Sequence, residues 1–385
     1  MSQRPIARSP DLQQLRNEGY SIEVISGHLV MRDVPYVTAA REVARGTLVS
    51  TLNMSDDTTR TPDTHVVYFA GSQPCRADGT AITTIMHGSN RHEIASGVIV
   101  DHSFSNKPAN GYQNYYEKMT TYETIIGNQA RAIDPNATAK TFAPIPAEQD
   151  NVFHYIDTAA SRAGIAAINE KLVKDKIIIV GLGGTGSYLL DLVAKTPVRG
   201  IDLYDGDRFL QHNAFRAPGA PSIEALRAAP FKVDYYAEQY GRMRRGITPH
   251  ACFITDDNVE ELRGANFVFL CMDRSTAKKT IIDRLTEWQI PFIDVGMGIA
   301  LTDGMLGGIL RVTTSTPESP AQRIPFTEQE DEYATNIQVA DLNALNATLA
   351  VVRWKKLCGF YRDLNNEHET TYTIDVNMLL SEEKG

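Results

Sequence analysis

The sequence predicts an α/β protein in which a doubly wound domain with a mixed sheet follows an α+β N-terminal domain. After about residue 150, short apolar runs alternate with helical patterns, which is typical of a mostly parallel sheet. Before residue 150, β-rich runs alternate with turn signals such as Asp78-Gly79 and Asn110-Gly111. A glycine-rich loop follows the first apolar run of the second region. We therefore expect domains at 1–150 and 151–385.

The length and composition exclude several classes of protein. A chain of 385 residues that is 42% hydrophobic and 22% charged is typical of a globular protein with two or three domains. The net charge of -9 argues against a nucleic-acid-binding protein, because such proteins carry a basic domain. No segment has the roughly 20 consecutive apolar residues of a membrane span. We expect neither nucleic acid nor a membrane as a partner.

The N-terminus and the cysteines predict the cellular compartment of the protein. The first 16 residues lack the apolar region of a secretory signal. The four cysteines (Cys75, Cys252, Cys271 and Cys358) are scattered and form no C-x-x-C pair. This pattern predicts a reducing compartment, so we expect a cytoplasmic protein without a structural zinc ion.

Local patterns place the expected elements. In the first domain we expect strands at 20–25, 46–54, 65–70 and 96–100, with helices at 11–18 and 113–128. In the second domain we expect parallel strands at 176–180, 200–204, 250–255, 266–272 and 291–295. The expected helices of the second domain are 157–173, 187–194, 231–240, 259–263, 275–288 and 337–360. Two late β-runs, 306–314 and 371–376, are expected to extend the sheet.

The glycine-rich loop predicts a nucleotide site. Gly181, Gly183, Gly184 and Gly186 lie between a buried strand and a helix, where they allow a tight turn and close approach of the backbone to a phosphate. Asp205 follows Gly186 by 19 residues at the end of the next strand, where a carboxylate can bind ribose hydroxyls. These features leave NAD, FAD and ATP open as the nucleotide.

The polar residues after Asp205 favour ATP. Asp207, Asn213 and Arg216 form a polar series that a dinucleotide oxidoreductase does not need. An enzyme that splits ATP between its α- and β-phosphates must hold the triphosphate and neutralise charge on pyrophosphate. Lys232, at the start of a helix, could reach those phosphates. Asp273, after the strand at 266–272, is placed to hold Mg²⁺ together with a second carboxylate.

In these motifs the sequence resembles the ThiF/MoeB/E1 adenylating enzymes, which activate ubiquitin-like proteins. The resemblance covers about residues 157–360. It implies a Rossmann-like adenylation domain that uses ATP and Mg²⁺ to adenylate the C-terminal carboxylate of a ubiquitin-like carrier. The phosphate loop is then formed by the glycines, with Gly183 and Gly184 lining it. Asp205 binds ribose, Asn213, Arg216 and Lys232 contact the phosphates, and Asp273 positions Mg²⁺.

The resemblance also implies partners. It implies a symmetric homodimer in which Arg162 enters the neighbouring site, and an E2-like protein as a further partner. The first domain is similar to the domains fused to ThiF modules in bacterial ubiquitin-like conjugation systems, which suggests partner or carrier recruitment.

The sequence departs from the family at the acyl acceptor. Thioester-forming members carry a cysteine between the late β-run and the final helix, but residues 316–336 contain none. Direct transfer of the adenylate, or an oxyester on a hydroxyl of this segment, therefore replaces the thioester; Ser319 and Thr335 are the candidate hydroxyls. Cys75, after Pro74 at an expected exposed turn, is the remaining candidate thiol.

Two other functions stay open from the residues alone. The first is an NAD(P)- or FAD-dependent oxidoreductase, since the glycine loop and Asp205 fit a dinucleotide equally well. The second is a non-catalytic nucleotide-binding scaffold that keeps the adenylating fold. Bound flavin or NADH would indicate the first, and absence of pyrophosphate exchange the second.

Overall fold

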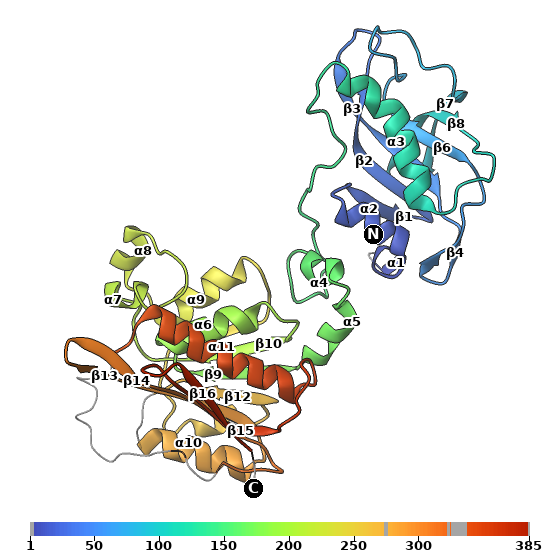
Figure 1. The fold of residues 1–385 in the computed structure, drawn as a ribbon. Helices are drawn as coiled ribbons and strands as arrows, with labels where there is room; N and C mark the ends of the chain where they lie inside the picture. Colours follow the sequence, from blue (N-terminus) through green and yellow to red (C-terminus); the bar gives the residue numbers. More distant parts are fainter. Residues whose placement is uncertain (1–3, 273–275, 322–323, 325–336, 384–385) are drawn as a thin grey trace. The chain divides into compact units, whose positions relative to one another are not determined.

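The structure is a computed structural model that describes residues 4–272, 276–321, 324 and 337–383. It divides into two compact units, coloured from blue to green and from green to red in Figure 1. Unit 1 comprises Met1–Glu148 and Asp157–Gly164, and unit 2 comprises Gln149–Ile156 and Ile165–Gly385. The segment Asp157–Gly164 therefore packs with the first unit, although it lies after residue 150.

Unit 1 is built on an antiparallel sheet of six strands in the order β1-β2-β3-β6-β8-β7. The strands are β1 (Ile22–Ile25), β2 (His28–Val37), β3 (Val43–Thr51), β6 (Val66–Ala70), β7 (Met86–Ala95) and β8 (Val98–Ser105). A separate short pair is formed by β4 (Met54–Ser55) and β5 (Thr58–Thr59). The helices are α1 (Arg4–Arg8), α2 (Pro10–Asn17), α3 (Tyr115–Arg131) and α4 (Thr158–Arg162).

The core of unit 1 lies between the sheet and its helices. α3 begins at Asn114, whose side chain accepts a hydrogen bond from the Glu117 amide, and it buries Tyr115, Met119 and Tyr122 against the sheet. The opposite face of the sheet has a smaller core that includes Val30, Val49, Val98 and Val100. The expected helices at 11–18 and 113–128 are thus present with shifted ends. The sequence patterns predicted no strand at the positions of β2 and β7.

A buried lysine gives unit 1 a pH-dependent stability. The Lys118 side chain on α3 is fully buried, and its Nζ donates to Ser50 Oγ at 2.9 Å and to the Thr64 carbonyl at 2.8 Å. Desolvation lowers the pKa of Lys118 to about 8, below the ordinary value of 10.5. At this group the folded state therefore binds fewer protons than the unfolded state between these two values, so the contribution of Lys118 to stability rises with pH in that interval.

We expect the free energy of unfolding to gain about 2 kcal/mol from this group between pH 8 and pH 10. Urea denaturation of the full chain measures it as a difference: relative to Lys118→Met, the wild type should gain about 2 kcal/mol between pH 8 and pH 10. Lys140→Met is the matched control, because Lys140 is an exposed lysine paired with Glu18. Equal pH profiles for the wild type and Lys118→Met would contradict the assignment.

Unit 2 contains, within the described residues, an eight-stranded sheet in the order β11-β10-β9-β12-β13-β14-β15-β16. The strands are β9 (Lys176–Val180), β10 (Gly200–Tyr204), β11 (Ile247–His250), β12 (Phe267–Leu270), β13 (Phe292–Thr302), β14 (Met305–Ser315), β15 (Glu367–Thr373) and β16 (Met378–Glu383). The strands from β11 to β13 pair in parallel, whereas β14, β15 and β16 are added antiparallel. This mixed sheet confirms the predicted fold class.

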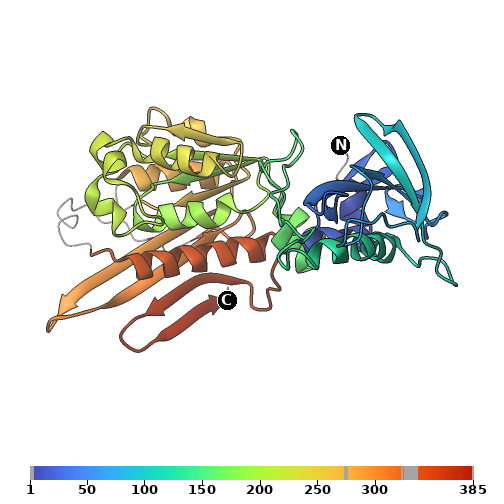
Figure 2. The ribbon, with the colours of Figure 1, turned by 90° about the horizontal axis from the view of Figure 1, so that it is seen from above.

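Helices cover both faces of this sheet. The described α-helices of unit 2 are α5 (Ala166–Asn169), α6 (Gly184–Ala194), α7 (Gln211–Ala214), α8 (Ile223–Ala228), α9 (Lys232–Gly241), α10 (Thr276–Glu287) and α11 (Ala340–Leu357), with 3-10 turns at Glu170–Leu172 and Val259–Leu262. Ile177 and Ile179 of β9 face α6, α9 and α11, whereas Ile178 and Val180 face the side that carries α10. Figures 1 and 2 both show α6 and α11 side by side on one face.

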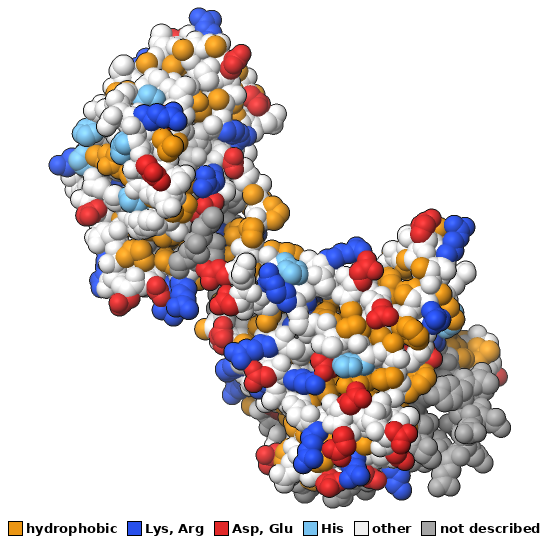
Figure 3. Space-filling model, turned by 180° about the vertical axis from the view of Figure 1, so that it is seen from behind, with side chains coloured by type: hydrophobic (Ala, Val, Ile, Leu, Met, Phe, Trp, Pro, Cys, Tyr) orange, Lys and Arg blue, Asp and Glu red, His pale blue; other side chains and the backbone are white. Residues whose placement is uncertain are grey.

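The antiparallel hairpins carry exposed apolar side chains. In Figure 2 the β13–β14 and β15–β16 hairpins extend beyond the helices. Their exposed large hydrophobic residues are Leu301, Met305, Leu306, Ile309, Met378, Leu379 and Leu380, together with Val376 in the turn before β16. On the face drawn in Figure 3, basic and acidic side chains are mixed over both units, and neither sign of charge forms a large patch.

Two predicted elements are wrong. The helix predicted at 157–173 is broken into α4, α5 and a 3-10 turn, because Gly164 adopts a left-handed φ of 68° that ends α4. The strand predicted at 250–255 lies earlier, at β11, and Phe253 in the following loop is exposed. The helix predicted at 337–360 is present as the shorter α11. None of the described helices has the length and apolar character needed to cross a membrane.

Candidate active site

The strand order locates a candidate ligand site at one edge of the sheet of unit 2. From β9 the chain proceeds to β10 and β11 on one side, and then returns to β12 and β13 on the other side. In open α/β sheets the loops at the carboxyl ends of the strands diverge at such a reversal and leave a crevice for ligands. The glycine loop follows β9, and the Asp205–Asp207 turn follows β10, so both lie at this edge.

The glycine loop has the geometry of a phosphate-binding turn. Gly181 has a φ of 90°, which lets the chain reverse directly after β9. α6 begins at Gly184 without a side-chain cap at Gly183, so backbone N–H groups of its first turn face the loop. A Cβ on Gly186 would overlap the Gly181 carbonyl oxygen, so the tight turn itself requires glycine there. The helix therefore starts three residues earlier than the sequence predicts.

Asn343 on α11 fixes the start of α6, and the sequence reading missed it. Its side chain is fully buried, accepts a hydrogen bond from Thr185 Oγ1 at 3.1 Å and donates to the Arg216 carbonyl at 3.2 Å. A Cβ on Gly184 would overlap this amide. The packing against Asn343 therefore requires glycine at position 184, in addition to any need of the phosphate loop. Asn343 thus brings the Arg216 backbone to the amino end of α6.

Two aspartates and a lysine form a compact ionic cluster beside the loop. Asp205 is 6% exposed, and its carboxylate accepts hydrogen bonds from the Leu182 amide at 2.7 Å and the Asp207 amide at 2.8 Å. Lys232 Nζ lies 2.7 Å from Asp207 and 3.4 Å from Asp205. The Lys232 side chain is buried, whereas the Asp207 carboxylate is 58% exposed. Asp205 therefore ties the glycine loop to β10, and Asp207 presents the accessible carboxylate.

Asn213 lies on the short helix α7, and Arg216 comes just after the end of this helix. Asn213 is buried and its side-chain oxygen accepts the Leu210 amide at 2.8 Å, so this oxygen caps α7. Arg216 is partly buried, and its Nε is a buried donor for which the described part of the chain offers no hydrogen-bond partner. The pKa of His212 is lowered by burial first and then by the positive charges of Arg216 and Lys232. Both cations therefore lie close to one side chain.

A second ionic cluster lies beside the carboxyl end of β12, where the last residue of that strand pairs with Asp294 of β13. Asp294 on β13 is fully buried, forms an ion pair with Lys278 on α10, and lies 3.3 Å from Arg311 on β14. Burial raises the pKa of Asp294 despite the two cations. Lys278 Nζ also donates to the Met272 carbonyl at 3.4 Å. This cluster, which sequence reasoning also missed, holds the turn that leads to Asp273; Asp273 itself lies outside the described residues.

Two of the three candidate acyl acceptors, Cys75 and Ser319, are buried. Cys75 is 3% exposed and its thiol donates to the Gln73 carbonyl, so the expected exposed turn is wrong. Burial raises the pKa of Cys75, which disfavours the nucleophilic thiolate. Ser319 is also buried, in a turn where it pairs with Thr316, and Thr335 lies outside the described residues. Arg162 ends α4 in unit 1, where it donates to the Asn17 carbonyl at 2.6 Å.

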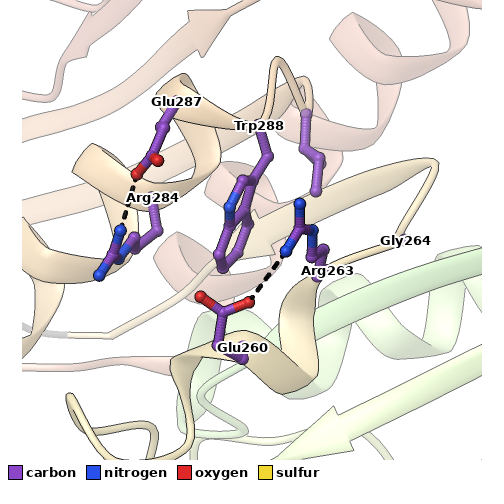
Figure 4. Close-up of a pocket in the computed structure, with 7 residues that line it drawn as sticks. Glu260, Arg263, Gly264, Arg284, Glu287 and Trp288 are labelled. Carbon is purple, nitrogen blue, oxygen red and sulfur yellow. Dashed lines mark hydrogen bonds and ion pairs between the residues drawn. The ribbon is translucent and has the colours of Figure 1, made fainter.

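A pocket of about 570 Å³ lies elsewhere in unit 2 (Figure 4). It is lined by Glu260, Arg263, Gly264, Arg284, Glu287, Trp288 and Ile290. Gly264 precedes β12 and Ile290 precedes β13, so the pocket lies toward the amino ends of these strands, opposite the candidate site. Arg263 pairs with Glu260 and Arg284 pairs with Glu287, so the charges of the pocket compensate one another. We assign it no part in the chemistry.

Comparison with known proteins identifies the class. Residues 139–378 match the model of the ThiF family, and residues 10–158 match a domain of unknown function, DUF6791. No curated protein matches the chain. The chain belongs to the ThiF family. This membership supports an ATP-dependent adenylating enzyme of the E1-like class and agrees with the resemblance of the glycine and aspartate motifs.

Solved structures similar to this one include the enzyme MccB from E. coli, with 16% identity and a TM-score of 0.46 over 59% of this chain and 67% of that chain. MccB with AMPCPP and the selenomethionine form of MccA has 16% identity and a TM-score of 0.48 over 71% of this chain and 83% of that chain. The structure of PaaA has 16% identity and a TM-score of 0.40 over 56% of this chain and 75% of that chain.

Proposed function

We propose that this protein uses ATP to adenylate the C-terminal carboxylate of a small ubiquitin-like protein. The observation that carries the proposal is the buried Nε of Arg216, a guanidinium donor without a hydrogen-bond partner among the described residues, in a residue whose backbone is bridged by Asn343 to the start of α6. A buried donor of this kind is costly unless an anion satisfies it. The triphosphate of ATP is such an anion, and the start of α6 supplies further positive potential.

The proposed reaction needs positioning and charge neutralisation more than proton transfer. A carboxylate is already ionised at neutral pH, so one of its oxygens can attack the α-phosphorus of ATP without a general base. The bond between the α-phosphorus and the bridging oxygen breaks, and its electron pair leaves with pyrophosphate. The products are an acyl-adenylate and pyrophosphate. Arg216 and Lys232 would stabilise the charge that develops on the leaving group.

We propose Mg²⁺ as the metal ion of this site. The accessible Asp207 carboxylate offers an oxygen ligand of the kind Mg²⁺ prefers, and we propose it as the second carboxylate beside Asp273. When bound, Mg²⁺ would neutralise part of the triphosphate charge. Asp205 has a different part: its carboxylate is engaged by two backbone amides, so it orients the loop and presents its remaining lone pairs to the ribose.

The proposed function includes protein partners. We propose a homodimer, an E2-like acceptor, and carrier or partner recruitment by unit 1, as the family resemblance implies. The exposed apolar side chains of the β13–β14 and β15–β16 hairpins support an interface on unit 2. Light scattering of the pure protein should give about twice the 42.6 kDa of one chain, and a monomer across micromolar concentrations would contradict the dimer.

Exchange of radiolabelled pyrophosphate into ATP tests the function. We expect exchange only when a ubiquitin-like protein with a free C-terminal carboxylate is present, since the reverse reaction needs the acyl-adenylate. The control variant is Asp273→Asn, which keeps the shape of the side chain and removes its charge; it should abolish exchange. Wild-type rates in this variant would reject Asp273 as the Mg²⁺ ligand. Protein that carries bound flavin or NADH and supports no exchange would favour an oxidoreductase instead.

A further inference from the structure

The order of the strands predicts where the base of a bound nucleotide would lie. The glycine loop follows β9, the Asp205–Asp207 turn follows β10, and the loop 251–258 follows β11. These three strands are neighbours in the sheet, in the order β11-β10-β9. With phosphates at the glycine loop and ribose at the β10 carboxylates, the next group of the nucleotide lies over the loop after β11. That group is the base.

An aromatic ring occupies this loop. Phe253 is 61% exposed, and its ring packs against Gly206, between the two site aspartates. A Cβ on Gly206 would lie 2.6 Å from the ring, so the absence of a side chain there allows the close approach. Single exposed hydrophobic residues are common on proteins, and exposure alone would indicate nothing. Phe253 is a candidate for ligand binding because its ring lies beside the proposed ribose site.

The loop holds the ring in place through its own hydrogen bonds. Asn258 accepts the Thr255 amide at 2.7 Å and donates its side-chain nitrogen to the Phe253 carbonyl at 3.1 Å. At the base of the loop, His250 at the end of β11 stacks on Tyr204 at the end of β10, with ring centroids 4.2 Å apart. The carbonyl of Phe253 is therefore held by Asn258 in a loop whose start is anchored by the His250–Tyr204 stack, and its side chain stays largely exposed without further ordering of the loop.

We propose that Phe253 is the platform on which the adenine ring of ATP stacks; this rests on the proposed function. Every nucleobase has a π-face, so stacking on an aromatic ring adds affinity with little selection among bases. Phe253 therefore strengthens the binding of ATP and GTP alike and has no effect on a ligand that consists of phosphates only. This difference separates a platform from a residue that merely supports the loop.

Binding titrations of the full chain with Mg-ATP and with inorganic tripolyphosphate test the platform. We expect Phe253→Ala to weaken ATP binding about tenfold, which corresponds to about 1.4 kcal/mol. Tripolyphosphate binding should not change, and Phe253→Tyr should bind ATP as the wild type does. The matched control is Phe142→Ala, because Phe142 is 63% exposed and its ring also packs against a glycine, Gly19, but in unit 1. This variant should bind both ligands normally.

A fluorescent variant gives a second measurement that does not depend on loss of binding. The tryptophan of Phe253→Trp should be quenched by ATP and GTP but not by tripolyphosphate. ATP affinity within twofold of the wild type in Phe253→Ala would overturn the platform, and so would parallel loss of ATP and tripolyphosphate binding. A wild-type protein that binds tripolyphosphate but no ATP would likewise overturn it. A wild type that binds neither ligand would instead contradict the proposed function.

Discussion

Replacement of Arg216 by alanine is expected to lower the rate of ATP–pyrophosphate exchange by about 100-fold or more. The Arg216 backbone is held near the amino end of α6 by the Asn343 bridge, and the buried Nε of its side chain has no acceptor among the described residues. Loss of one preorganised donor to a charged transition state typically costs a factor of about 100 to 1,000 in rate. The measurement is exchange at saturating carrier and ATP, with the melting temperature followed in parallel to confirm folding.

Two variants sharpen this prediction. Arg216→Lys keeps the charge but loses the planar fork of donors, so an intermediate rate is expected. Arg242→Ala is the matched control, because this arginine is exposed and forms only a surface pair with Glu238 on α9. Exchange in Arg216→Ala within about threefold of the Arg242→Ala rate would exclude Arg216 from the phosphate site, since a donor that matters there costs far more.

Replacement of Asp294 by asparagine is expected to lower the free energy of unfolding by about 3 kcal/mol or more. Removal of one partner from a buried ion cluster leaves the remaining charges uncompensated, which is far more costly than loss of a surface pair. Here the change removes the buried carboxylate that lies between Lys278 and Arg311, while the shape of the side chain stays. Urea denaturation at pH 7 measures the effect.

The matched control for Asp294 is Asp175→Asn. Asp175 pairs with Arg199 on the surface, where both side chains are more than 60% exposed, so its loss should cost less than about 1 kcal/mol. An Asp294→Asn variant no less stable than Asp175→Asn would show that the buried cluster does not hold β13 and the Met272 turn as described.

The parts of the fold that were predictable are those that a local pattern determines. The continuous apolar run of β9 and the alternation of strands with helices gave the parallel part of the sheet, because buried parallel strands are apolar on both faces. The predicted strand at 250–255 is wrong because β11 ends at His250 and the Phe253 ring lies exposed against Gly206. The predicted helix after Asp157 is broken at Gly164, which has a left-handed φ, and a glycine is the sequence signal that a helix ends there.

In the candidate site, too, the residues that are close in sequence were predictable, and those that meet only through packing were not. Asp205, Asp207 and Lys232 lie within 28 residues of one another, and the structure brings all three into one ionic cluster. Asn343 was missed because it meets Thr185 only through the packing of α11 against α6, 158 residues apart in the sequence. Asp294 was missed for the same physical reason, since its partners come from α10 and β14. A buried polar residue on a core-facing position is the signal that could have indicated both.

Transfer of label from ATP to a carrier protein tests the central claim most directly. The enzyme is incubated with a ubiquitin-like protein and ATP labelled at either the α- or the γ-phosphate, and the reaction is quenched in acid. Adenylation predicts that the carrier gains the mass of one AMP, that only the α-label travels with it, and that pyrophosphate is released in equal amount. γ-label on the carrier, or hydrolysis to ADP and phosphate with an unmodified carrier, would contradict cleavage between the α- and β-phosphates and with it the proposed function.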